Sequence, residues 1–178
     1  MLAFVIRFKY GTTILEELPI GLVQDVQLDY MHLVCLGVVR KLLKLWVRGP
    51  KESRQEIDMR EELSLKLSKV AMFVPVEFNR RPRSLLELDR WNSTEFRFFL
   101  LYGGPIVLSS ILKQGLYENF LSVHVAITIL ASPSSSPSEI DYAEELLRFF
   151  IKVFANIYGK HRRTMCMHCP TLLQTHVT

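Results

Sequence analysis

Residues 28–43 read LDYMHLVCLGVVRKLL, in which an acidic residue and a histidine three positions apart open a long apolar run. Asp29 is a residue type that accepts hydrogen bonds from the free backbone N–H groups at the start of a helix, and the leucines and valines after it recur at helical spacing. Gly49-Pro50 follows Arg48, and glycine and proline typically follow the end of a helix. The stretch therefore predicts a core helix from about Asp29 to Arg48.

The rest of the chain continues this helical pattern. The further predicted segments are an amphipathic stretch that ends before Pro75 and helices at about 118–130 and 138–158. Between them, Ser93 or Asn92 can cap a helix through Leu101, which is interrupted at Gly103-Gly104-Pro105 and resumes through Leu112. The apolar face predicted for the amphipathic stretch consists of Leu63, Leu65, Leu67, Val70, Ala71 and Phe73. The predicted fold class is mainly α, a helical bundle with little strand.

Length and composition indicate one globular domain. The chain has 178 residues, of which 49% are hydrophobic and 22% charged, enough for a domain with a sizeable core. We expect the helical domain at residues 11–159, with a serine- and proline-rich loop at 132–138 (SPSSSPS). Residues 1–10 are interpreted as a short strand or a remnant. Residues 160–178 form a basic tail that contains cysteine and histidine.

Charge and hydropathy restrict the partners. A net charge of +4 and a pI near 9.0 permit DNA as a partner without demonstrating it. No stretch approaches the roughly 20 apolar residues that cross a membrane. Three cysteines, an odd number, fit a reducing compartment better than a disulfide scaffold. We therefore expect an intracellular protein with no membrane association.

The stretch at 28–43, with Asp29 and His32, is accompanied by further blocks along the chain. These are residues 11–19 (GTTILEELP), 25–28 (DVQL), 81–85 (RPRSL), 90–105 (RWNSTEFRFFLLYGGP), 118–127 (ENFLSVHVAI) and 141–147 (DYAEELL). In this order they resemble the Asp-x-x-His signature and neighbouring blocks of transposases of the CACTA (En/Spm) class and the animal proteins derived from them. The resemblance covers most of residues 11–159.

The resemblance implies a ribonuclease-H-like enzyme in which two aspartates and a glutamate hold Mg²⁺ or Mn²⁺. Such ions activate water and then a DNA 3′-hydroxyl for strand transfer. The strand bearing the first aspartate would precede the signature, and only 28 residues precede Asp29. The catalytic core is therefore expected to be incomplete, and no cofactor is expected in this chain. Its helices would correspond to the helical insertion of that core. Glu95 is the candidate third carboxylate, and Asp29, His32 and Trp91 match motif positions.

Each of these motif residues also has an ordinary structural interpretation. Asp29 and His32 lie three apart, so the carboxylate can orient the imidazole, but the pair can equally be a helix cap beside a partly buried histidine. Trp91 and Glu95 lie four apart and can contact each other across one turn. Alternatively, Trp91 packs in the core before a capped helix, and Glu95 adds favourable charge to the first turn of that helix.

Arg80, Arg81 and Arg83 form a basic group that can contact DNA phosphates, since guanidinium groups bind phosphate in a bidentate manner. The alternative is a solvated surface run. The group lacks interleaved aromatic residues and a helix that could read bases, so sequence-specific recognition is not predicted.

The C-terminal tail contains a weak candidate for zinc. Cys166 and Cys169 have the spacing of zinc-binding thiolates, and His168 and His176 lie nearby. A redox pair of the Cys-x-x-Cys type is a second interpretation. Against both, a zinc site usually has two such pairs, and Pro170 follows directly. The favoured interpretation is no metal site.

These observations give the functional expectation. The chain is expected to be a fragment of a transposase-derived protein related to metal-dependent DNA strand cleavage and transfer, inactive alone and nuclear. The alternative is a domesticated DNA-binding or protein-interaction module that retains the helical scaffold without catalysis. Its oligomeric state is left open by the sequence.

Overall fold

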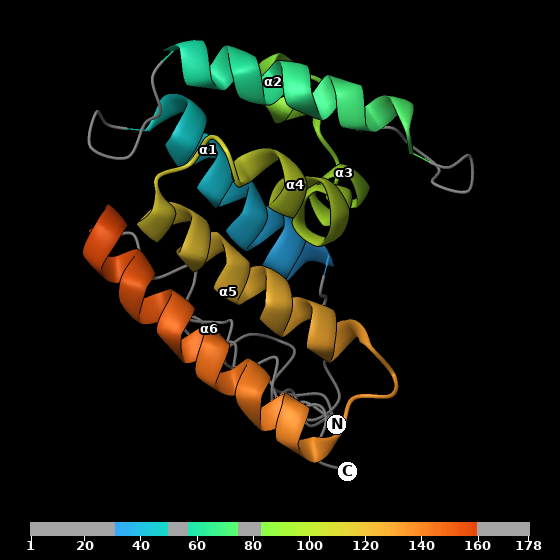
Figure 1. Ribbon diagram of the computed structural model, residues 1–178, viewed down its shortest axis with the longest axis vertical. Coiled ribbons are helices and arrows are strands. Elements are labelled where there is room, and N and C mark those ends of the chain that lie inside the picture. The colour runs from blue at the N-terminus through green and yellow to red at the C-terminus, as the bar shows by residue number, and fades with distance from the viewer. Residues whose placement is uncertain (1–30, 50–56, 75–82, 160–178) are drawn as a thin grey trace, which may run out of the picture.

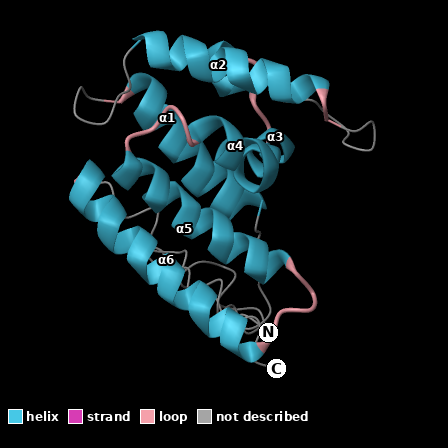
Figure 2. Cartoon of the chain, viewed as in Figure 1, coloured by secondary structure: helices cyan, strands magenta, loops and turns pink. Residues whose placement is uncertain are grey.

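The computed structural model describes residues 31–49, 57–74 and 83–159, and within them it contains helices and no strand (Figures 1 and 2). This confirms the mainly helical fold class. The elements are a π-helix η2 (Met31–Val39), α1 (Arg40–Arg48), α2 (Ile57–Met72), a 3₁₀-helix η3 (Leu85–Arg90), α3 (Ser93–Phe98), a π-helix η4 (Phe99–Gly103), α4 (Gly104–Leu108), α5 (Gln114–Ala131) and α6 (Pro137–Tyr158).

The bundle is built around the predicted core helix, which the structure gives as η2 followed by α1. Figure 1 shows α2 on one side of this central pair and α5 with α6 on the other. Helix η2 packs against α3, and α5 packs along α6. In the ranges 31–49, 57–74 and 83–159, the structure has no helix both long and apolar enough to span a membrane.

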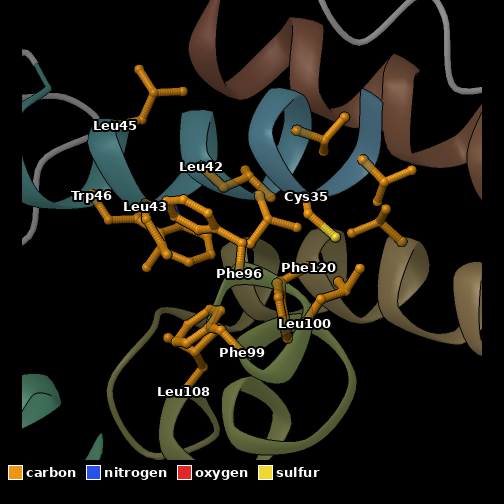
Figure 3. Close-up of a cluster of buried hydrophobic side chains, with 14 of the residues drawn as sticks. Cys35, Leu42, Leu43, Leu45, Trp46, Phe96, Phe99, Leu100, Leu108 and Phe120 are labelled. Atoms are coloured by element: carbon orange, nitrogen blue, oxygen red, sulfur yellow. The ribbon is translucent and has the colours of Figure 1, made fainter. Parts of the chain in front are cut away.

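The buried side chains explain why this helix lies at the centre. Leucine, valine and cysteine side chains of η2 and α1 are buried together with aromatic rings from α1, α3, η4 and α5. Figure 3 shows Trp46, Phe96, Phe99 and Phe120 in one cluster. The ring centroids of Trp46 and Phe120 are 6.1 Å apart, and those of Phe99 and Phe120 are 5.9 Å apart, both in edge-on geometry. Gly49 ends α1, as predicted.

The apolar face predicted for α2 is partly wrong. Leu65 is 57% exposed and Phe73 is 83% exposed. Among residues 60–74, the buried hydrophobic side chains are Leu63, Leu67, Ala71 and Val74, and Val70 is partly buried. They recur every three or four residues, whereas Leu65 lies two residues from Leu63 and from Leu67 and therefore projects from the opposite side of the helix.

The helix interruption predicted at Gly103-Gly104-Pro105 is also wrong, because the backbone stays helical from Ser93 to Leu108. Helix α3 is followed directly by the π-helix η4 and then by α4. Pro105 lies in the first turn of α4, where its missing N–H is tolerated. Helix α4 ends at Leu108, four residues before the predicted end at Leu112.

Candidate functional site

Glu95, the candidate third carboxylate, lies in the first turn of α3. Asn92 caps this helix, and its side-chain oxygen accepts a hydrogen bond of 3.2 Å from the Glu95 backbone N–H. The Glu95 Oε2 atom in turn accepts a 3.0 Å hydrogen bond from the Asn92 backbone N–H. The pair forms a capping box, which satisfies two of the free donors at the start of a helix. Asn92, one of the two predicted caps, is therefore the cap.

The same carboxylate forms a buried ion pair with Arg83. Arg83 Nε donates to Oε1 at 3.0 Å, and Arg83 Nη2 donates to Oε2 at 3.2 Å. The Arg83 backbone N–H also donates to Oε1 at 3.3 Å. The Glu95 side chain is fully buried, while the Arg83 side chain is 33% exposed. The guanidinium therefore compensates a carboxylate that water does not reach.

These contacts use the hydrogen-bonding capacity of Glu95. Each carboxylate oxygen accepts two hydrogen bonds, one from the guanidinium and one from a backbone N–H. An ionised carboxylate has about four acceptor positions, so these four donors fill the acceptor positions of Glu95. A metal ion at this carboxylate would have to displace donors of the protein. The arrangement instead holds residues 83–92 against the start of α3.

Trp91 completes the same local unit. Its indole Nε1–H donates a 3.2 Å hydrogen bond to the backbone oxygen of Ser84, and its ring is buried. The ring centroid lies 5.3 Å from that of Phe96 and 6.2 Å from that of Phe99. Trp91 thus packs in the core just before the capped helix α3, the arrangement of its structural interpretation.

The structure brings together the helices of two matching blocks but not their motif side chains. Helix η2, which carries His32, packs against α3, which carries Glu95. His32 is exposed, whereas Glu95 is buried. Several predicted site residues lie outside the described residues: Asp29, Arg80, Arg81, Cys166, His168, Cys169 and His176.

A basic row on α1 was missed by the sequence reasoning. Lys44 and Arg48, one turn apart, both form ion pairs with Asp89 of η3, at 3.2 Å in the case of Lys44. Hydrogen bonds from Arg48 and then Lys44 hold the pKa of Asp89 below its ordinary value of 3.8. The spacing of four in the sequence was the available signal, because it places two cations on one helix face.

Two further polar contacts link α5 to its neighbours. His124 Nδ1 lies 2.8 Å from the backbone oxygen of Leu100 in η4, so this nitrogen carries the hydrogen that the carbonyl accepts. The Asn119 side-chain NH₂ group donates a 3.0 Å hydrogen bond to the backbone oxygen of Phe150 in α6. Over the parts of the chain that the structure describes, no three His, Cys, Asp or Glu side chains are grouped so that they could hold a metal ion.

Comparison of the chain with protein-family models, with curated proteins and with solved structures found no match. The resemblance to transposases therefore rests on the residues of the chain itself.

Proposed function

We propose that this chain is the helical part of a transposase-derived protein, related to enzymes that cleave and transfer DNA strands with divalent metal ions, and that it does not cut DNA on its own. In a full-length enzyme, Mg²⁺ or Mn²⁺ would supply the Lewis acid chemistry. The helices would correspond to the insertion of a ribonuclease-H-like core. A nuclear location belongs to the same proposal.

The engagement of Glu95 supports the part of this proposal that denies DNA cleavage to this chain alone, and the relation to transposases is supported by the sequence resemblance. A carboxylate that binds catalytic metal ions needs open oxygen positions facing the reaction. Both oxygens of Glu95 instead accept hydrogen bonds from Arg83 and from the cap of α3. In this chain the Glu95 carboxylate therefore stabilises the fold.

The alternative is a domesticated DNA-binding or protein-interaction module without catalysis. The contacts of Arg83 favour the protein-interaction form of this module, because Arg83 donates its Nε and Nη2 hydrogen bonds to Glu95 and so does not offer them to phosphate. Phosphate contacts would fall to other cations, of which Arg97 on α3 is exposed.

A plasmid-nicking assay tests the proposal. The full chain, incubated with supercoiled plasmid and Mn²⁺ or Mg²⁺, is expected to give no more nicked product than metal alone. Nicking that requires metal, and that Glu95→Gln abolishes without lowering the unfolding temperature, would show that Glu95 is catalytic and overturn the proposal.

A DNA-binding measurement separates a DNA-associated role, with or without ancestral catalysis, from a protein-interaction module. Fluorescence anisotropy with a labelled duplex should show binding that weakens steeply with salt if cations of this chain contact phosphates. Salt-sensitive binding favours the DNA-associated function, and its absence favours the protein-interaction module.

A further inference from the structure

The outer side of α6 carries a row of exposed side chains along most of the helix. Tyr142 is 51% exposed and Phe149 is 47% exposed, and Glu145, Lys152 and Asn156 are exposed as well. These five positions follow one another at steps of three and four residues, so they lie on one face of the helix. We call this set the outer row of α6.

The outer row lies opposite the side of α6 that packs in the core. Leu147 is fully buried, and Glu145 and Phe149 each lie two positions from it, which is about 200° around a helix. Figure 1 shows α6 at the edge of the bundle, with α5 between it and the central pair of η2 and α1. The outer row therefore faces away from the helices that the structure describes.

The charges of the outer row are arranged symmetrically about Phe149. Glu145 precedes Phe149 by one helical turn, and Lys152 follows it by one turn. Neither Glu145 nor Lys152 forms an ion pair with another residue in the ranges that the structure describes. Both charges are thus available to a partner that approaches this face.

This arrangement makes the outer row complementary to a second copy of itself. If two α6 helices lie antiparallel with a two-fold axis at Phe149, Glu145 of each copy lies beside Lys152 of the other. The same axis brings the two Phe149 rings together and sets Tyr142 beside Asn156 of the other copy. A parallel pair would instead place like charges beside each other, which is unfavourable.

Arg148 is a further charge near this axis. It forms an ion pair with Glu144, one turn earlier on the same helix. The positive charge of Arg148 is therefore compensated within each copy when two copies approach.

We infer that the outer row of α6 is the interface of a homodimer, in which α6 packs antiparallel against α6 of a second copy around Phe149. A helix of 22 residues is about 33 Å long, so one helix from each copy gives an interface at or below the roughly 1,200 Å² of small specific interfaces. The dimer is accordingly weak and depends on concentration. The inference goes beyond the proposed function and does not depend on it, because neither Glu95 nor any DNA contact is part of the interface.

Sedimentation of the full chain in an analytical ultracentrifuge, from micromolar to millimolar concentration, tests the inference. The experiment is done at about 0.15 M salt, where charges far from the interface are screened. We expect a reversible equilibrium between monomer and dimer. A chain that stays monomeric up to millimolar concentration would overturn the inference.

Charge reversals locate the interface. Glu145→Lys alone and Lys152→Glu alone are each expected to weaken the dimer by about tenfold or more, because each places like charges beside each other in both symmetric halves. The two changes combined in one chain restore opposite charges and should return the dissociation constant close to that of the unaltered chain. The control is Glu61→Lys at an exposed position of α2, which makes the same charge change and should leave the dimer intact.

An equimolar mixture of the two single variants gives the sharpest readout. One variant carries lysine at both positions and the other carries glutamate at both, so they are expected to associate with each other more tightly than either does with itself. Misfolding of a variant could not produce this gain. A dimer that the single reversals leave unchanged, or a mixture that associates no better than its components, would overturn the inference.

Discussion

The indole N–H of Trp46 donates a 2.7 Å hydrogen bond to the hydroxyl oxygen of Tyr158, across 112 positions of the sequence. Trp46 lies on α1, and Tyr158 is the last residue of α6. Both side chains are buried, so the bond lies in the core and fixes the end of α6 against the central helix. No feature of the sequence predicts that these two helices contact each other.

Replacing Tyr158 with phenylalanine is expected to lower the free energy of unfolding by about 1–3 kcal/mol, because the buried Trp46 N–H loses this acceptor. Chemical denaturation measures the change. Tyr142→Phe, at a half-exposed position of α6, is the matched control and should change stability by less than about 0.5 kcal/mol. Equal effects of the two variants would contradict the role given to this hydrogen bond.

Gly104→Ala is expected to destabilise the protein by about 1–3 kcal/mol or more through overpacking. A Cβ atom at Gly104 would lie 2.5 Å from the backbone oxygen of Phe99 and 2.7 Å from Cζ of Phe120. Gly115 on α5 has no atom within 4 Å of such a Cβ, so Gly115→Ala should be neutral or stabilise by up to about 1 kcal/mol. Thermal melts of both variants give the comparison, and a stable Gly104→Ala would show that α4 and α5 are less closely packed.

Leu42→Asp is expected to cost several kcal/mol, about 4 or more, because it places an unpaired charge in the core. Leu42 is buried in the first turn of α1. The control is Ile106→Asp on α4, whose side chain is largely exposed, and its cost should be far smaller. A Leu42→Asp variant that melts with the unaltered protein would mean that the buried face of α1 is assigned wrongly.

The ion pairs of Asp89 predict a contribution to stability that depends on pH. Hydrogen bonds from Arg48 and Lys44 lower the pKa of this carboxyl in the folded chain, so the contribution is present above the ordinary pKa of 3.8 and is lost as the pH falls through the lowered value. The stability difference between the unaltered protein and Asp89→Asn should therefore shrink as the pH falls below 3.8. Asp141→Asn, at an exposed position on α6, is the control variant. A difference that grows with acidification would contradict the assignment.

The presence of a helix could be predicted from the sequence where apolar residues recur at helical spacing over a long stretch. The central helix up to Gly49 and the last helix up to Tyr158 were predicted correctly at their C-terminal ends. The buried face of α2 was not predicted correctly, because Leu65 and Phe73 are apolar but lie away from the buried side chains of this helix. The 3₁₀-helix Leu85–Arg90 was missed, since its short leucine-rich run carries no distinct period.

The local role of Glu95 was partly predictable, and its partner was not. Its position three residues after Asn92 is the pattern of a capping box, which the sequence shows directly. Arg83 lies twelve residues earlier, on the other side of the 3₁₀-helix η3, so no helical or strand spacing could place its guanidinium on Glu95. Burial of the carboxylate follows only from the tertiary packing of α3 against η2.

A double-mutant cycle on Arg83 and Glu95 tests most directly whether the Glu95 carboxylate stabilises the fold through its ion pair with Arg83. Arg83→Met alone should cost about 3 kcal/mol, because it leaves Glu95 buried without compensation. In the background of Glu95→Gln, which has no charge to compensate, the same change should cost at least about 1 kcal/mol less. Costs that add within about 0.3 kcal/mol would show that the two side chains do not depend on each other and would contradict the account.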